Sequence, residues 1–298
     1  MLTRRRFIAI SAALAPSLAL ADRPALHVET GIALGAKVTL RLRHPDAPKL
    51  AAAAMAEIRR LEAVFSLYRA EAALVRLNRD GRLDAPPFEL LDCLALAGRV
   101  HRASGGRFDP TVQPLWQAQA AAFSRGAALS ETERSRAQAL TGWDRVGIAA
   151  EAITLAPGMA LTLNGIAQGY IADRVAHLLA EAGLTEALID TGELVALPTG
   201  DWPVTLPSGK TIGLRDRALA TSAPLGMTFG GDGRSSHILD PMTGRPVRSP
   251  WQSVSLSAPS AALADALSTA ACLTGNRDEI AALCAAFPGT MLHAAIPA

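Results

Sequence analysis

The sequence predicts a domain of the α+β (mixed α/β) class, in which strands and helices are interleaved along the chain. Segments with alternating apolar and polar residues, typical of strands, are separated by segments whose apolar residues recur every three or four positions, as in helices. These segments follow no regular strand–helix–strand rhythm, and we find no internal repeat or low-complexity linker. With 298 residues, 50% of them hydrophobic, the chain can bury a substantial core. We therefore expect one interleaved domain.

The first part of this domain is predicted to contain a strand pair and two helices. Residues 26 to 43 alternate around Gly31 and Gly35, which indicates paired strands. From Ala47 to Phe65 the apolar residues recur at helical steps, and Phe88 to Ser104 forms a second apolar helix that ends at a Gly-Gly pair. We expect a loop with a short helical turn between these helices, and a proline-rich loop after the second one.

The remaining segments continue the alternation. Ser130 to Leu140 is predicted as a charged helix, with Ser130 as N-cap and Glu133 completing a capping box. Residues 152–184 are predicted as strand, turn, strand, glycine loop and helix, and "EALIDTGELVAL" as a strand pair. Strands and turns then lead to a helix from about Ser260 to Gly275. A last helix from Arg277 to Phe287 precedes a short final strand.

The first 21 residues resemble an export signal. Three consecutive arginines precede an apolar stretch that is short and rich in small residues for a membrane span. An Ala-Leu-Ala cleavage signal ends at Ala21, so we expect a signal peptide at 1–21 and the mature domain at 22–298. The Arg-Arg-x-Phe-Ile order is similar to a twin-arginine signal, with an ordinary secretory signal as the alternative. Either signal predicts a periplasmic protein.

Charge and cysteine content exclude several classes of partner. The formal net charge of +2 comes largely from the three signal arginines, and no basic patch is interleaved with aromatic residues, so we expect no nucleic-acid partner. The three cysteines, Cys93, Cys272 and Cys284, form no C-x-x-C pair, which argues against a zinc knuckle or a redox motif. Cys272 and Cys284 lie in apolar helical sequence, where we expect buried thiols, although a disulfide stays open.

Two segments present groups that could bind a ligand. In "LTLNGIAQGYIADRVAHLL", a loop with Gly165 and Gly169 would let the backbone approach a ligand closely. The pattern matches neither the dinucleotide fingerprint nor the Walker loop, and a plain strand–helix connector is the alternative. In "SSHILDPMTGRPV", Asp240 opens a strong turn signal three residues after His237. A lone histidine of this kind is more often structural than catalytic.

A single acidic residue, Asp265, interrupts the nearly apolar stretch "PSAALADALSTAACLTG". Ser260 can cap a helix here, and Thr269 follows Asp265 by four residues, so both side chains lie on one helix face. A carboxylate beside a hydroxyl is the oxygen ligation that Mg²⁺ prefers, with phosphate oxygens and water completing the octahedron. A buried aspartate needs such a partner because an unpaired buried carboxylate is costly. The alternative is a solvated aspartate near a threonine that bonds to its own helix.

Together these segments resemble the ApbE-like FAD:protein FMN transferases, a family of exported, magnesium-dependent flavin transferases. The resemblance covers nearly the whole chain after the signal, in the family's order. The matching segments are "SLYRAEAALVRLNRDG", "GGRFDPTVQPLW", "LNGIAQGYIADRV", "TGELVAL", "ATSA", "SHILDPMTGRPV" and "APSAALADALSTA". The H-I-x-D-P-x-T-G turn and the A-D-A-x-x-T helix are specific in combination. The signal and the "LNGIAQGY" variant are similar to the NosX subgroup, which is associated with maturation of the nitrous-oxide reduction system.

The resemblance implies a reaction and a metal site. FMN would pass from FAD to a Thr or Ser hydroxyl of an acceptor flavoprotein associated with the membrane, and AMP would leave. Mg²⁺ would bind the pyrophosphate and neutralise charge on the transferring phosphoryl group. By the family pattern, Asp265 and Thr269 supply side-chain oxygens to Mg²⁺, with Ser268 nearby, and Gly165 supplies a backbone carbonyl.

The resemblance also implies a base and a flavin site. His237 or Asp240 would orient or deprotonate the incoming hydroxyl. Tyr68 falls where an aromatic side chain stacks on the isoalloxazine. The other residues expected to contact FAD are Leu34, Arg107, Phe108, Asp109, Thr162, Gln168, Ile238 and Leu239.

The sequence departs from the family pattern at three positions. Thr162 stands where the family commonly has aspartate, Gln168 where it has lysine or glutamate, and Ala223 where the pattern ends in glycine. The first two changes affect groups expected near FAD and the metal. Two alternatives therefore stay open, namely a flavin-binding accessory protein with weak or no transfer and an FAD pyrophosphatase that uses water as acceptor. A serine hydrolase is disfavoured because no G-x-S-x-G motif occurs, and a purely structural protein would leave Asp265 unexplained.

Overall fold

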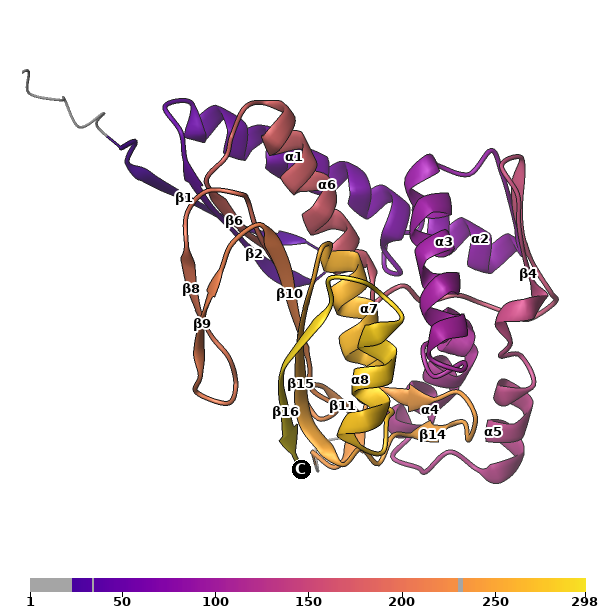
Figure 1. Ribbon diagram of the computed structural model, residues 1–298. Helices are drawn as coiled ribbons and strands as arrows, with labels where there is room; N and C mark the ends of the chain where they lie inside the picture. The colour runs from indigo at the N-terminus through magenta and orange to yellow at the C-terminus, as the bar shows by residue number, and fades with distance from the viewer. Residues whose placement is uncertain (1–22, 34, 230–232) are drawn as a thin grey trace, which may run out of the picture.

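The computed structural model describes residues 23–33, 35–229 and 233–298, in which strands and helices interleave as predicted (Figure 1). The predicted signal peptide and Leu34 lie outside the described residues. At the centre is an antiparallel seven-stranded sheet with strand order β1-β2-β6-β7-β10-β15-β16. The predicted α+β class is confirmed. Among the described residues, no helix combines the length and apolar character that a membrane span requires.

Strands occur in the central sheet and in four smaller sheets. The central strands are β1 (Leu26–Ala33), β2 (Ala36–Arg43), β6 (Ala187–Asp190), β7 (Leu194–Ala196), β10 (Arg217–Ser222), β15 (Trp251–Ala258) and β16 (Met291–Pro297). The smaller sheets are β3 (Arg82–Asp84), β5 (Ala152–Leu155) and β4 (Val146–Ile148); β8 (Trp202–Thr205) and β9 (Thr211–Leu214); β11 (Thr228–Phe229) and β12 (Ser235–Ser236); and β13 (Leu239–Asp240) and β14 (Arg245–Pro246).

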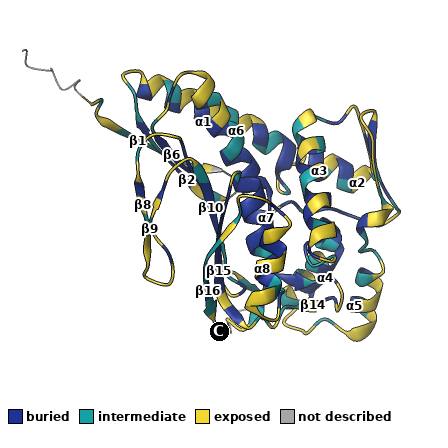
Figure 2. Ribbon diagram, in the orientation of Figure 1, coloured by how far each residue is buried: buried dark blue, intermediate teal, exposed yellow. Residues whose placement is uncertain are grey.

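Helices cover one side of the central sheet, whereas the β8–β9 hairpin extends on the other (Figure 1). The helices are α1 (Ala47–Phe65), α2 (Ala73–Asp80), α3 (Phe88–Ala103), α4 (Gln113–Ser124), α5 (Glu131–Gln138), α6 (Ala167–Glu181), α7 (Ala261–Ala271) and α8 (Arg277–Ala285), with 3-10 turns η1 (Pro110–Val112) and η2 (Trp143–Arg145). Helix α7 packs against β10, β15, α6, α3 and α8. It is accordingly among the most buried elements (Figure 2).

The position of α7 is fixed by its contact with α6. Gly169 of α6 touches the first turn of α7 so closely that a Cβ at this position would lie 2.3 Å from the carbonyl oxygen of Ala261. Asp173, one turn further along α6, accepts hydrogen bonds from the backbone N–H groups of Ala261 (2.7 Å) and Ala262 (2.9 Å). Ser260 accepts a further bond from the first turn, as a predicted N-cap should. Helix α6 therefore both contacts and caps the helix that carries Asp265.

Most predicted elements are confirmed, and two predictions are wrong. Helix α4 begins inside the segment predicted as a proline-rich loop, because prolines at the first turn of a helix remove only N–H groups that have no helical partner. The predicted second strand at 160–163 is absent. There the backbone of Leu161 exchanges two hydrogen bonds with the Asn78 side chain, and the N–H of Thr162 bonds to Pro110. Cys272 and Cys284 are buried and unpaired, as expected, and so is Cys93.

Candidate active site

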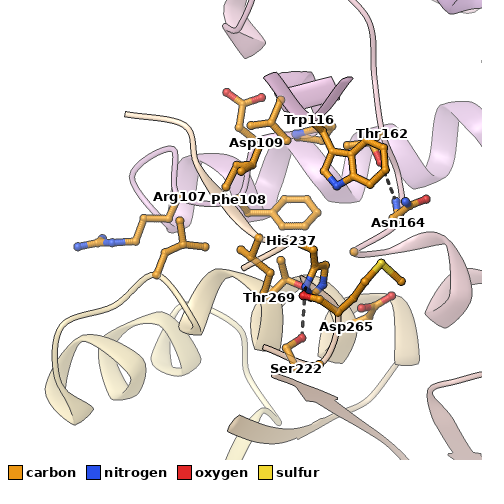
Figure 3. Close-up of a pocket in the computed structure, with 18 of the residues that line it drawn as sticks. Arg107, Phe108, Asp109, Trp116, Thr162, Asn164, Ser222, His237, Asp265 and Thr269 are labelled. Atoms are coloured by element: carbon orange, nitrogen blue, oxygen red, sulfur yellow. Dashed lines mark hydrogen bonds between the residues drawn. The ribbon is translucent and has the colours of Figure 1, made fainter. Parts of the chain in front are cut away.

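A cavity of about 400 Å³ opens beside α7 (Figure 3). Its walls come from the segment around η1, the loop before α6, the β6–β7 turn, the end of β10, the strand segment around His237, and α7. The structure thus brings together segments that are far apart in the sequence. The predicted site residues on its walls are Arg107, Phe108, Asp109, Thr162, Gly165, Gln168, His237, Ile238, Leu239, Asp265 and Thr269.

Three predicted residues that the structure describes are not on these walls. Tyr68 is 79% exposed and is not among the residues that line the cavity. Ser268 is fully buried beneath the wall, and Leu34 lies outside the described residues. The Asp240 carboxylate accepts hydrogen bonds from the N–H of Met242 (2.8 Å) and the hydroxyl of Thr243 (3.0 Å), so it holds its own turn together and faces a neighbouring hollow.

The oxygen atoms of α7 lie at one end of the cavity. Asp265 is 4% exposed, and its carboxylate accepts one long hydrogen bond, 3.5 Å, from the N–H of Gly169. Burial, reinforced by the charge of Asp173, raises the pKa of Asp265 to about 8. The hydroxyl of Ser222 lies 2.7 Å from that of Ser268 and 3.3 Å from that of Thr269. Ser268 is therefore a support for Ser222, which in turn positions Thr269.

Gly165 brings the loop before α6 close to this cluster. A Cβ at Gly165 would lie 3.1 Å from the hydroxyl oxygen of Thr269 and 3.3 Å from the ring of Phe108. Any larger residue would therefore crowd both side chains. The close approach places the Gly165 backbone beside the oxygen atoms of α7 and beside an aromatic wall, as expected for a loop whose backbone contacts a ligand.

His237 presents a defined tautomer at the cavity wall. Its Nδ1 lies 2.8 Å from the carbonyl oxygen of Met227 and 3.3 Å from that of Pro224. A carbonyl oxygen can only accept a hydrogen bond, so Nδ1 carries the proton and Nε2 has a free lone pair. Nε2 is thus the atom at which His237 can take up a proton.

Asp109 has a structural task at the other end of the cavity. One carboxylate oxygen of Asp109 accepts hydrogen bonds from the N–H (2.8 Å) and the hydroxyl (2.6 Å) of Thr111. Asp109 is thus the N-cap of η1. Arg107 pairs with Glu279 at 2.8 Å. The neighbouring Phe108 ring is buried and forms part of the apolar wall.

The three departures from the family pattern, Thr162, Gln168 and Ala223, all lie at the cavity. The Thr162 hydroxyl accepts a hydrogen bond from the N–H of Asn164 at 3.3 Å. Gln168 lies against the β6–β7 turn, where a Cβ at Gly192 would come within 3.1 Å of its side-chain oxygen. Thr162 and Gln168, which are both neutral, therefore have contacts within the protein.

Sequence reasoning did not single out several residues of the cavity. Trp116 adds an aromatic side chain to the wall, Ser222 adds a hydroxyl, and Glu193 adds a carboxylate. Glu193 is 8% exposed, and burial, reinforced by the charge of Asp265, raises its pKa. All three residues belong to segments quoted above, "GGRFDPTVQPLW", "ATSA" and "TGELVAL". Only the folded chain brings them together.

The donor set suits a hard divalent cation. The described residues contain no group of three His, Cys, Asp or Glu side chains that could hold a metal ion. The carboxylates of Asp265 and Glu193 instead face a cavity that also offers the Thr269 hydroxyl and the Gly165 backbone. Oxygen donors of this kind fit Mg²⁺ better than a metal that prefers imidazole or thiolate. Glu193 Oε2, which is buried without a hydrogen-bond partner, is consistent with a cation in this place.

Comparisons with known proteins show which proteins this chain is similar to. The FAD:protein FMN transferase of Treponema pallidum is 33% identical over 263 residues, covering 76% of this chain and 72% of the relative. A protein of the same name from Klebsiella pneumoniae is 29% identical over 245 residues, covering 76% of each chain. The apo crystal structure of the Pseudomonas stutzeri flavinyl transferase ApbE superposes with a TM-score of 0.77 at 25% identity, covering 92% of this chain and 96% of that one.

A second solved structure, the ApbE protein of Thermotoga maritima, gives a TM-score of 0.79 at 25% identity and covers 90% of this chain and 93% of that one. The fold is thus shared over nearly the full length of both solved chains. Residues 34–291, which include every described wall residue of the cavity, match the ApbE family. The chain belongs to the ApbE family.

Proposed function

We propose that this protein is an FAD:protein FMN transferase, which moves FMN from FAD to a Thr or Ser hydroxyl of an acceptor flavoprotein and releases AMP. The observation that carries the proposal is the meeting of an apolar, aromatic wall with a buried oxygen cluster in one cavity. Phe108 and Trp116 offer surfaces for a flavin, and Asp265 and Thr269 offer ligands for a cation that binds phosphate. The names of the curated relatives support the same activity.

Mg²⁺ is the proposed metal, and Asp265, Thr269 and the Gly165 carbonyl would hold it. When bound, it would neutralise charge on the pyrophosphate and on the leaving phosphate. The protein's own contribution is to fix these oxygen atoms in place. The Gly169 N–H orients the Asp265 carboxylate, and Ser222 orients the Thr269 hydroxyl.

The transfer step needs one proton acceptor. The acceptor hydroxyl oxygen would form a bond to the phosphorus on the FMN side of FAD, and the bond from this phosphorus to the AMP phosphate oxygen would break. The hydroxyl proton would pass to Nε2 of His237, whose Nδ1 is already committed to the Met227 carbonyl. The two carboxylate oxygens of Asp240 bond within their own turn, which favours His237 over Asp240 as the base.

We further propose that the protein acts in the periplasm, on an acceptor associated with the membrane. The support is the sequence alone, because residues 1–21 have the arginines, apolar stretch and cleavage signal of an exported precursor. Detection of the mature chain, beginning at Asp22, in a periplasmic fraction would test the location. A chain that retains Met1 and stays in the cytoplasm would contradict it.

The activity is tested by incubating the mature protein with FAD, MgCl₂ and a periplasm-facing fragment of a candidate membrane flavoprotein, followed by intact mass. We expect the acceptor to gain one FMN, and AMP to appear in equal amount. Asp265→Ala should abolish the gain, while Asp46→Ala, at an exposed position before α1, should leave it unchanged. Release of AMP and free FMN without any acceptor would instead support an FAD pyrophosphatase. Tight FAD binding with neither product would support an accessory protein.

A further inference from the structure

Glu193 is a buried carboxylate to which the proposed mechanism gives no task. It lies in the turn between β6 and β7, on the wall of the cavity, and is 8% exposed. Its Oε2 atom is buried and has no hydrogen-bond partner among the described residues. Burying a carboxylate in this way is costly unless a positive charge or a set of donors compensates it.

The protein itself supplies little compensation. Burial raises the pKa of Glu193, the nearby Thr221 backbone opposes this rise, and the charged group that most affects Glu193 is another carboxylate, that of Asp265. Among the described wall residues, Arg107 is the only arginine or lysine, and its guanidinium already pairs with Glu279 at 2.8 Å. Two carboxylates therefore face one cavity without a cationic side chain of their own.

We propose that Glu193 is a second acidic member of the cation site, and that its free Oε2 fixes the Mg²⁺ held by Asp265, Thr269 and Gly165. This inference rests on the proposed function, because the same cation serves both. A divalent cation between the two carboxylates removes their repulsion and gives Oε2 the partner that it lacks.

Glu193 acts here as a direct ligand of the cation, and its position in the fold suits this task. It belongs to the central sheet through the β6–β7 turn, whereas Asp265 and Thr269 belong to α7. A cation bound by both would link the sheet to the helix across the cavity. The turn carries Gly192 at a φ of +107°, a conformation that glycine adopts readily and that sets the direction of the next residue.

The competing explanation is that Glu193 only anchors the Thr221 backbone. The two explanations predict different effects of Glu193→Gln on Mg²⁺ binding. A glutamine keeps an acceptor for the Thr221 N–H and removes the repulsion with Asp265. A residue of the cation site should therefore give an apo protein that melts at the same or a higher temperature, together with weaker Mg²⁺ binding. A purely structural residue should leave Mg²⁺ binding intact.

The test is calorimetric titration of the full mature protein with MgCl₂, with thermal melts at zero and saturating Mg²⁺. We expect Glu193→Gln to weaken Mg²⁺ binding by at least roughly 10- to 100-fold, the loss typical of residues that only support a metal ligand, and to shrink the gain in Tm on adding Mg²⁺. The matched control is Asp190→Asn in the same turn. Asp190 is outside the cavity wall and accepts a bond from the Gly192 N–H, so Mg²⁺ affinity should stay within about twofold.

Unchanged Mg²⁺ affinity in folded Glu193→Gln would overturn the inference and leave the proposed function intact, because wild-type transfer is measured separately. If Glu193→Gln does not fold, Glu193→Asp takes its place. It keeps the charge but withdraws the carboxylate by one methylene, and it must also lose affinity for the inference to stand. Failure of the wild-type protein to bind Mg²⁺ at all would overturn both the inference and the metal in the proposed function.

Discussion

Replacement of Gly169 by alanine tests the idea that the contact between α6 and α7 builds the site. A Cβ at this position would lie 2.3 Å from the carbonyl oxygen of Ala261 and 2.6 Å from the nitrogen of Ala262. Ordinary contact between such atoms needs about 3.5 Å, so the helices would have to separate by about 1 Å. Both atoms belong to the backbone of α7. The Asp173 carboxylate binds the N–H groups of Ala261 and Ala262, so this part of the backbone cannot rotate away.

Gly169→Ala changes the free energy of unfolding through two opposing contributions, helix propensity and packing. Alanine is favoured over glycine inside a helix by about 1 kcal/mol. Overpacking typically costs about 1–3 kcal/mol and occasionally more, and a clash with fixed backbone belongs at the upper end. We therefore expect Gly169→Ala to lower the free energy of unfolding by about 2 kcal/mol, equivalent to a fall in Tm of roughly 4–8 °C.

The change should also damage the site, because the Gly169 N–H is the donor to Asp265. Urea unfolding and Mg²⁺ titration of the same samples should both show a loss. Gly98→Ala in α3 is the comparison, since its Cβ would meet the ring of Trp143 at 3.0 Å, a side chain that can shift more readily than backbone. We expect a smaller loss of stability there and unchanged Mg²⁺ affinity. Equal or greater stability of Gly169→Ala than of the wild type would refute the reasoning.

Two further predictions concern pH and the support of the cavity. Burial raises the pKa of Asp265 to about 8, so the folded, metal-free protein binds this proton more tightly than the unfolded chain does. Its stability should therefore fall between about pH 4 and pH 8, by up to about 1.4 kcal/mol per pH unit from this group; melts across this range should show the fall, and Asp265→Asn should reduce it, leaving the part that the raised pKa values of Asp173 and Glu193 contribute. Asn78→Ala would leave both backbone groups of the buried Leu161 unpaired; urea unfolding should show a loss of about 1–3 kcal/mol, with no loss refuting the role.

Local patterns in the sequence were enough to predict most elements. Helix α1 occupies the range that its apolar periodicity indicated, and α5 has the capping box expected from Ser130 and Glu133. Local patterns failed where a distant residue decides the backbone. The Asn78 side chain takes both hydrogen bonds that a neighbouring strand would otherwise make with Leu161, and no periodicity near Leu161 can reveal this.

The candidate active site shows the same limit of prediction from local sequence patterns. Asp265 stood out because it is the one acidic residue in an apolar helix, and that contrast is visible in the sequence. Glu193 did not stand out, because a Gly-Glu pair in a turn between two strands is typical of an exposed hairpin. Its burial depends on the packing of α7 against the sheet. Tyr68 shows the reverse, since it follows an apolar helix and yet is exposed.

The buried carboxylates also explain why α6 and α7 must fit so closely. Asp173 is partly buried, and desolvation raises its pKa to about 6, yet its two hydrogen bonds cap α7 and partly offset that cost. Asp265 has only the long bond from Gly169. The same helix pair thus gives one carboxylate two hydrogen-bond donors and leaves the other, on the cavity wall, with a single long bond and in need of a ligand. The hydrogen bonds of Asp173 contribute to the stability of the fold. The Asp265 carboxylate has no positively charged partner in the protein, which is the property that a cation site requires.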